Sequence, residues 1–265
     1  MTNWLRAAAF ALWFYGVTFA FCFAGLGVRL VAPARALDFA KAWVRAVFAG
    51  MGPICGIRLV VTGQEHLPSH GPALIASQHQ SEFDTLVWMI LVPQTTYVMK
   101  QELTRIPLFG PLLTLAGMIP VDRAAGASAL RKLLQETAGA IRTGRQIVIF
   151  PEGTRVAPGQ RVALQPGFAA IAARLGLPVH PVATDSGRCW ARDPFRRRSG
   201  TIHVAIGPAI PAGTPRAALL AQVEGFWRRM ENDAFAPVDK LVEQTRRLAA
   251  PLPQETVNTL ANHDS

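Results

Sequence analysis

The sequence contains little cysteine. Only three occur among its 265 residues, namely Cys22, Cys55 and Cys189. They lie far apart, form no CxxC motif and do not make an even-numbered disulfide framework, so their spacing excludes a cysteine-based zinc or redox site. A chain with this cysteine content suits a reducing compartment.

Acidic residues are also scarce. Lys and Arg number 27 against 17 Asp and Glu, which gives a formal charge of +10 at pH 7. Such an excess favours anionic partners, either phosphate headgroups or nucleic acid, and charge alone does not choose between them. Half of the residues are apolar, and the length suits one globular catalytic domain with a membrane-seeking segment rather than two large domains.

One long stretch lacks charge altogether. Residues 7–28 carry no charged side chain, and a helix of this length, at about 1.5 Å per residue, crosses the hydrocarbon core of a bilayer. A signal peptide cleaved near Ala34 is the competing interpretation, which the length of the run and Arg29 oppose. Positive charge is denser after the stretch than before it, so the positive-inside rule predicts that the catalytic domain faces the cytoplasm. We expect the membrane to be the inner (plasma) membrane.

The next segment has the pattern of an amphipathic helix. At 37–51 apolar side chains recur with helical spacing, whereas Asp38, Lys41 and Arg45 share the opposite face. Such a helix can lie in the membrane interface and complete a re-entrant hairpin, or it can pack against the catalytic domain. Both arrangements leave the same pattern, so a single span and a hairpin stay open.

Beyond residue 53 short β-type runs alternate with helical stretches. The expected strands are 58–61, 73–77, 96–99, 118–121, 147–150, 179–182 and 201–206, and the expected helices are 83–91, 107–116, 127–143, 166–175 and 216–234. We predict an α/β fold with a mixed, largely parallel sheet flanked by helices, preceded by an N-terminal membrane-embedded helix or helical hairpin. The predicted division is 1–52 for the membrane-associated helices, 53–235 for the catalytic domain and 236–265 for a peripheral C-terminal helix and tail.

Polar side chains follow four of the expected strands. His79, Lys100 and Arg123 each come soon after a strand, and 152–155 follow another. If these strands are parallel, their carboxyl ends meet at one edge of the sheet, which is where open α/β sheets bind ligands. The sequence therefore predicts a single site that contains a histidine, acids and several cations.

His79 and Asp84 are candidates for a general base and its partner. Five residues of regular helix rotate by about 500°, which would place the two side chains on different faces, so His79 must precede the helix. From the first helical turn Asp84 can then orient the imidazole and stabilise its protonated form, as a general base requires. A hydrogen-bonded turn histidine is the competing interpretation, because such pairs are common.

The turn at 150–155, with the sequence Phe-Pro-Glu-Gly-Thr-Arg, suits an anion. Gly153 lets the backbone approach closely, and the Thr154 hydroxyl and the Arg155 guanidinium can bind a phosphate. The competing interpretation is a plain surface turn in which Arg155 pairs with Glu152.

Together these blocks resemble the glycerophosphate and lysophosphatidic acid acyltransferase family, in which an HxxxxD block lies about seventy residues before a PEGTR block. The resemblance spans 71–182, and 117–123 and 179–182 look like two further family blocks. It implies that His79 is the base and Asp84 its partner. Six residues are candidates for binding the phosphate of the acceptor, namely Lys100, Arg123, Glu152, Gly153, Thr154 and Arg155.

The resemblance also implies a reaction. A fatty acyl group would pass from acyl-CoA or acyl carrier protein (acyl-ACP) to the free hydroxyl of lysophosphatidic acid, giving phosphatidic acid, with no metal or other cofactor. Departures from the family pattern at Gln78, Val156 and 165–166 leave glycerol 3-phosphate or another lyso-lipid, such as a lyso-aminolipid, as alternative acceptors. A Ser-His-Asp hydrolase is disfavoured because the chain has no G-x-S-x-G elbow, and a non-catalytic lipid-binding adaptor is disfavoured because both charged motifs are intact.

Residues 188–198 combine five arginines with two aromatic side chains. Anchoring on anionic lipid fits both residue types, binding of coenzyme phosphate fits the arginines alone, and contact with nucleic acid would need a recognised domain that the sequence lacks. A solvated basic loop is the fourth interpretation. We therefore expect membrane phospholipids, and no nucleic acid, among the partners.

Overall fold

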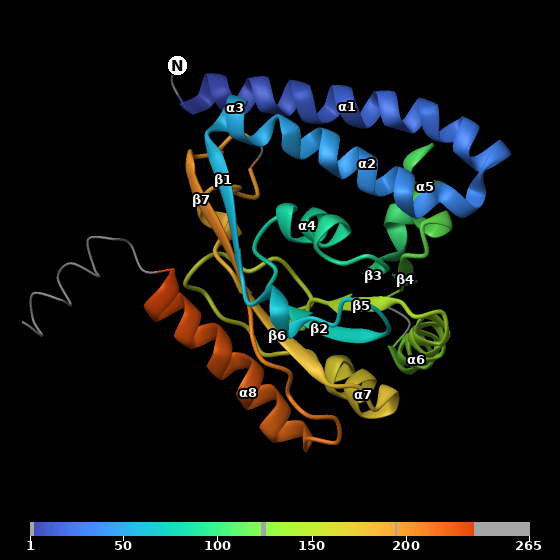
Figure 1. The fold of residues 1–265 in the computed structure, drawn as a ribbon, viewed down its shortest axis with the longest axis vertical. Coiled ribbons are helices and arrows are strands. Elements are labelled where there is room, and N and C mark those ends of the chain that lie inside the picture. The colour runs from blue at the N-terminus through green and yellow to red at the C-terminus, as the bar shows by residue number, and fades with distance from the viewer. Residues whose placement is uncertain (1–2, 123–125, 194, 236–265) are drawn as a thin grey trace, which may run out of the picture.

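The structure is a computed structural model that describes residues 3–122, 126–193 and 195–235. Its centre is a seven-stranded sheet with the order β1-β7-β6-β2-β5-β3-β4 (Figure 1). The strands are β1 (Ile57–Thr62), β2 (Ala73–Ser77), β3 (Thr95–Lys100), β4 (Ile119–Val121), β5 (Gln146–Ile149), β6 (Val179–Thr184) and β7 (Gly200–Ile206). Neighbouring strands pair in parallel except β6 and β7, so the predicted mixed, largely parallel sheet is confirmed.

Helices cover both faces of the sheet (Figure 1). On one face lie α1 (Asn3–Val31), α2 (Ala36–Ala49), α3 (Met51–Cys55), α4 (Phe83–Leu91) and α5 (Phe109–Leu115), and on the other lie α6 (Gly126–Arg142), α7 (Pro166–Leu175) and α8 (Arg216–Arg229). Alternation along β2 supplies both cores, because Ile75 points into the first and its neighbours Leu74 and Ala76 point into the second.

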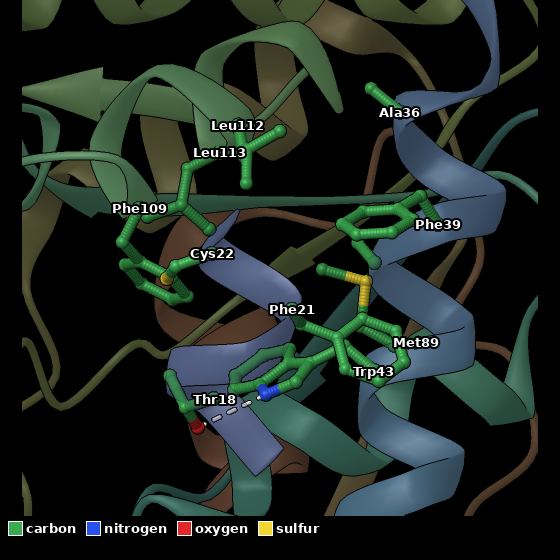
Figure 2. Close-up of a pocket in the computed structure, with 11 residues that line it drawn as sticks. Thr18, Phe21, Cys22, Ala36, Phe39, Trp43, Met89, Phe109, Leu112 and Leu113 are labelled. Atoms are coloured by element: carbon green, nitrogen blue, oxygen red, sulfur yellow. Dashed lines mark hydrogen bonds between the residues drawn. The ribbon is translucent and has the colours of Figure 1, made fainter. Parts of the chain in front are cut away.

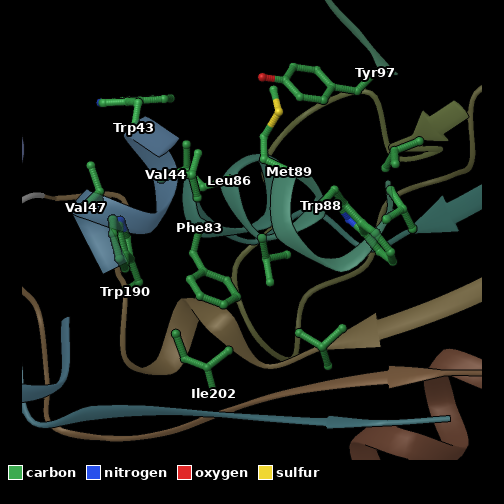
Figure 3. Packing of buried hydrophobic residues seen from close by; sticks show 14 of the residues in the cluster. Trp43, Val44, Val47, Phe83, Leu86, Trp88, Met89, Tyr97, Trp190 and Ile202 are labelled. Carbon is green, nitrogen blue, oxygen red and sulfur yellow. The ribbon is translucent and has the colours of Figure 1, made fainter. Parts of the chain in front are cut away.

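The core on the first face fixes α4 (Figure 3). Phe83 and Trp88 of this helix are fully buried, together with Trp190 from the segment before β7. Phe48 of α2 stacks on Phe83 with ring centroids 5.2 Å apart. Burial of each large apolar side chain stabilises the fold by about 1.5–3 kcal/mol, so α4 is held firmly between α2 and the sheet.

The helices α1 and α2 form a hairpin, joined by the 3₁₀-helix Pro33–Arg35 (Figure 1). Trp13 Nε1 donates a hydrogen bond to the Ala46 carbonyl at 3.1 Å, and Trp43 Nε1 donates to Thr18 Oγ1 at 3.1 Å. Trp43 and other apolar residues of α2 are buried against the catalytic domain. The apolar stripe of the amphipathic helix therefore packs on protein.

The helix α1 carries an exposed apolar face. Ala7, Phe10 and Ala11 are buried against the rest of the molecule. The exposed large side chains are Trp4, Leu5, Leu12, Trp13, Tyr15, Phe19, Phe23, Leu26, Leu30 and Val31. Within the described residues α1 is the one helix long and apolar enough to cross a membrane. An apolar surface of this extent is characteristic of contact with lipid or with another protein.

The predicted strands and helices of the catalytic domain are all present, most with boundaries within two residues of those expected, and two helices differ in a way that has a local cause. The helix expected at 107–116 begins only at Phe109, because Leu108 has a left-handed φ of 63° and separates α5 from the 3₁₀-helix Gln101–Arg105. The helix expected at 216–234 ends as an α-helix at Arg229 and continues as the π-helix Met230–Ala234. Residues 236–265, predicted to form a peripheral helix and tail, lie outside the described residues.

Candidate active site

The predicted site residues follow strands whose carboxyl ends share one edge of the sheet. β2, β5, β3 and β4 are consecutive neighbours and all run parallel. Of the residues that follow them, His79, Lys100 and the three residues of 153–155 line a common cavity. Arg123 lies outside the described residues.

His79 lies in the turn between β2 and α4. Its Nδ1 is 3.4 Å from Oδ2 of Asp84, a long but direct contact between base and carboxylate. The same oxygen accepts the backbone N–H groups of Gln80 at 2.6 Å and Ser81 at 2.7 Å. Asp84 is only 1% exposed. Its carboxylate stabilises the turn through the two N–H groups and also faces the imidazole, which is the arrangement that the spacing predicted.

Three further contacts hold His79 in place. Its ring stacks on Phe150, with centroids 4.3 Å apart. Its backbone N–H donates to Oε2 of Glu152 at 2.6 Å, and its carbonyl accepts the N–H of Val156 at 2.7 Å. With Nδ1 directed at Asp84, Nε2 is the ring nitrogen left for a substrate.

Glu152 ties the two motif blocks together. The side chain is buried, and burial raises its pKa to about 8, although the hydrogen bond from the His79 N–H opposes the shift and the charges of Asp84 and Glu231 add to it. At neutral pH the carboxyl group is therefore largely protonated. Its contact with the backbone of His79 makes Glu152 a candidate for positioning that residue.

Gly153 gives the turn its shape. Its φ is +69°, a conformation that side chains rarely adopt, and an added Cβ would lie 2.8 Å from Cγ of Gln165. Glycine is thus required here both for the backbone conformation and for space. The turn places Thr154 and Arg155 at the cavity.

Arg155 pairs with Glu82, and the interpretation in which it pairs with Glu152 is wrong. Its Nη1 lies 2.7 Å from Oε1 of Glu82, and both side chains are partly exposed. Glu82 immediately precedes α4 and lies between His79 and Asp84 in the sequence. The sequence separation of 73 residues gave no sign of this ion pair.

The cavity has a charged part and an apolar part, with a volume of about 530 Å³. Its ionisable side chains include His79, Glu82, Lys100, Arg155 and Arg192. Its apolar side chains include Phe14 of α1, Trp43 of α2, Phe109 and Leu113 of α5, and Leu86 of α4. A substrate with one anionic end and one apolar end matches this lining.

A second, smaller cavity continues the apolar part (Figure 2). It shares Trp43, Phe109 and Leu113 with the larger cavity and has a volume of about 30 Å³. Phe21 of α1 and Phe39 of α2 also line it, and almost all of its surface is apolar. The apolar environment therefore extends from the candidate base toward the helical hairpin.

Sequence reasoning missed several residues of the cavity. Phe14 and Trp43 were assigned to membrane-associated helices, and only the folded hairpin brings them to the site. In the segment 188–198, Trp190 and Arg197 are buried, whereas Arg192 lines the cavity. One loop thus contributes both to the core and to the site.

A half-buried histidine, paired with a buried aspartate beside a cationic and apolar cavity at the ligand-binding edge of an α/β sheet, is the arrangement expected of an enzyme that acts on amphipathic anionic substrates. Residues 58–185 match the family model described as Acyltransferase. A 1-acyl-sn-glycerol-3-phosphate acyltransferase of Pseudomonas aeruginosa is 34% identical over 203 residues, which cover 76% of this chain and 79% of that protein. The chain belongs to this acyltransferase family.

Other relatives agree. A 1-acyl-sn-glycerol-3-phosphate acyltransferase of Limnanthes douglasii is 33% identical over 59% of this chain, although the match spans only 56% of the plant protein. The crystal structure of the 1-acyl-sn-glycerophosphate acyltransferase PlsC from Thermotoga maritima superposes with a TM-score of 0.71 and 20% identity, covering 89% of this chain and 100% of that one. At this identity the likeness supports the fold.

Proposed function

We propose that the protein transfers a fatty acyl group from an acyl thioester, either acyl-CoA or acyl-ACP, to the free hydroxyl of lysophosphatidic acid, giving phosphatidic acid. The observation that carries the proposal is that His79, paired with buried Asp84, opens onto a cavity lined by cations and apolar side chains. The acceptors named for the relatives of this chain support the same choice.

In the proposed mechanism Nε2 of His79 removes the proton from the acceptor hydroxyl as its oxygen attacks the thioester carbonyl. The tetrahedral intermediate collapses with cleavage of the C–S bond, and the imidazolium returns the proton to the departing thiolate. Asp84 stabilises the imidazolium and fixes its ring. This sequence balances without a metal or redox cofactor.

The phosphate of the acceptor is assigned to the charged part of the cavity. Lys100 and Arg155 supply the positive charge, and Gly153 and Thr154 supply a closely approaching backbone and a hydroxyl. Arg123 remains a proposed contact on the strength of the family resemblance. Glu152 is proposed to act through the backbone of His79.

The acyl chains are assigned to the apolar part. Phe14, Trp43 and Phe109 line this part of the larger cavity. Trp43 and Phe109 also line the smaller cavity (Figure 2). A hydrocarbon chain placed there gains roughly 0.8 kcal/mol for each buried CH₂ group. Binding energy of this kind can orient the thioester carbonyl beside the base.

The protein is membrane-associated, and we propose the inner (plasma) membrane with the catalytic domain on the cytoplasmic side. The exposed apolar face of α1 supports the membrane contact. The cluster of Arg29, Arg35, Lys41 and Arg45 after the apolar run supports the orientation.

The substitution His79→Ala tests the proposed chemistry. Without the base, esterification of lysophosphatidic acid should fall by about 10²- to 10⁴-fold, measured as phosphatidic acid formed from a single acyl thioester in detergent or vesicles. His70→Ala is the matched control, because His70 is an exposed loop histidine. Unchanged turnover in His79→Ala protein would exclude the base assignment.

A panel of acceptors tests the choice of substrate. Supplied with the same acyl thioester, lysophosphatidic acid should be esterified faster than glycerol 3-phosphate or a lyso-aminolipid, and the products can be identified by mass. A preference for either alternative would replace the acceptor but leave the reaction type unchanged. Absence of any esterified product would favour a non-catalytic lipid-binding adaptor.

A further inference from the structure

Glu82 lies where its carboxylate contacts the proposed anion site directly. Its Oε1 is 2.7 Å from Nη1 of Arg155, and both residues line the cavity that contains His79. Its Oε2 accepts a hydrogen bond from Trp190 Nε1 at 3.3 Å. The Glu82 carboxylate thus binds the Arg155 guanidinium that is proposed to bind the acceptor phosphate.

The ion pair between Arg155 and Glu82 is open to an entering phosphate. The side chains of Arg155 and Glu82 are 30% and 45% exposed, and ion pairs that are open to solvent contribute little net stability. A phosphate group accepts the same forked hydrogen bonds from arginine as a carboxylate and carries more charge. An entering phosphate can therefore replace Glu82 at Arg155.

A second cation, Arg197, interacts electrostatically with Glu82. The guanidinium of Arg197 stacks over Trp190 at 4.4 Å and over Phe10 at 5.0 Å. Burial lowers the pKa of Arg197, and the charge of Glu82 raises it again. Glu82 thus keeps a favourable electrostatic environment, and its hydrogen bond from Trp190, when Arg155 turns to another anion.

We propose that Glu82 is a specificity-determining residue that competes with the acceptor's phosphate for Arg155. In the free enzyme Glu82 holds the guanidinium in place and screens its charge. On binding, the phosphate takes over Arg155, and Glu82 stays with Trp190 and Arg197. The competition weakens the binding of phosphorylated acceptors, and this inference rests on the proposed function.

The substitution Glu82→Gln tests the competition, since it removes the charge and keeps the size of the side chain. The KM for lysophosphatidic acid and the inhibition constant of inorganic phosphate should both fall, by up to about fivefold, the range expected when one partly exposed charge pair is removed. Glu102→Gln is the matched control. Glu102 is an exposed carboxylate on the 3₁₀-helix Gln101–Arg105, and the described part of the chain offers it neither a hydrogen bond nor an ion pair.

A double variant shows whether the effect passes through Arg155. In an Arg155→Ala background, Glu82→Gln should leave both constants unchanged, because the guanidinium for which the two anions compete is gone. An unchanged or raised KM in the single variant would overturn the proposal. A merely structural role for Glu82 would instead lower the melting temperature and kcat without tighter phosphate inhibition, which would also overturn it.

Direct binding separates this inference from the proposed function. Binding of lysophosphatidic acid to the full chain in detergent, measured by calorimetry, does not depend on turnover. If the wild type binds but does not esterify this lipid, the proposed function fails while tighter binding by the Glu82→Gln protein still supports the competition. If esterification proceeds and binding is not tighter, the competition alone fails.

Discussion

Asp84 combines two tasks in one oxygen atom. Its Oδ2 accepts the N–H groups of Gln80 and Ser81 and also faces Nδ1 of His79. The carboxylate therefore shapes the turn that places the histidine before α4, and in the proposed mechanism it also stabilises the imidazolium. An acid five residues after the base is useful because the intervening residues form a turn, and a regular helix would separate the pair.

Glu152 should make stability dependent on pH. Its pKa is about 8 in the folded protein, because of burial, against an ordinary value of 4.5. Between these values the folded state keeps a proton that the unfolded state has lost, so stability falls as the pH rises from about 4.5 to about 8 and then levels off. Glutamine at this position stays neutral and can still accept the His79 N–H.

Thermal unfolding at pH 5 and at pH 8 measures this dependence. Relative to the wild type, Glu152→Gln protein should gain several degrees in melting temperature between pH 5 and pH 8, since each unit of pKa shift is worth about 1.4 kcal/mol. Glu136→Gln, at an exposed position on α6, provides the control. A difference that does not change with pH would show that the carboxyl group is not perturbed.

The individual site residues were predicted unequally well. The spacing of His79 and Asp84 was enough to place the base before a helix, because helix geometry excludes the other arrangement. The competing interpretation, in which Arg155 pairs with Glu152, is wrong, since Glu152 is near in sequence whereas Glu82 is near only in the fold. An acid that is close in sequence does not identify the partner of an arginine when the turn points its carboxyl group at another residue, as Glu152 points at the N–H of His79.

At the scale of the elements, strands were easier to predict than helix boundaries. β2 and β6 are buried at every position, as expected for short apolar runs at the centre of a sheet covered on both faces. Leu108 was not foreseen as a break, because leucine rarely adopts a positive φ and nothing local marks it. In the structure Leu108 is the central residue of a γ-turn, in which the Phe109 N–H donates to the Pro107 carbonyl at 2.7 Å.

The apolar face of α1 should control membrane partitioning. Phe19 and Phe23 are exposed and in mutual contact, with ring centroids 4.6 Å apart. Replacing both with glutamate places charges in a helix that would otherwise contact hydrocarbon, and charged side chains cost about 2.5–3.5 kcal/mol each near the centre of a bilayer. The double variant should move from the membrane fraction to the soluble fraction.

Sedimentation with neutral phosphatidylcholine vesicles measures the partitioning. Val162→Glu is the control, because Val162 is an exposed apolar residue outside α1. If the double variant remained fully bound to neutral vesicles, the exposed face of α1 would have to contact something other than lipid.

The positive charge of the whole molecule should add a salt-dependent component to membrane binding. The loop 188–198 lies beside α1, because Trp190 packs edge-on against Phe10 at 5.1 Å. Arg196 and Arg198 are exposed, whereas Arg197 is buried and cannot reach a membrane surface. Replacing Arg196 and Arg198 with alanine should weaken binding to anionic vesicles by about fivefold for each charge, at about 1 kcal/mol per residue.

This component can be isolated by comparing lipid compositions. The loss should be seen with phosphatidylglycerol vesicles at low salt and should vanish in neutral vesicles or at high salt. Arg174→Ala removes the same kind of charge from α7, on the opposite side of the sheet from α1 (Figure 1). Equal losses from the loop and from α7 would indicate a general effect of net charge.

The position of Phe14 and Trp43 in the cavity wall has a kinetic consequence. Because α1 and α2 contribute these side chains, the reaction chamber and the lipid-facing helix are parts of one structure. With α1 in the proposed contact with the membrane, we expect a lysolipid to reach the cavity by lateral diffusion within a leaflet, without crossing water. Turnover should accordingly follow the mole fraction of lysolipid in the bilayer, so that adding inert lipid dilutes the substrate even when its bulk concentration is constant.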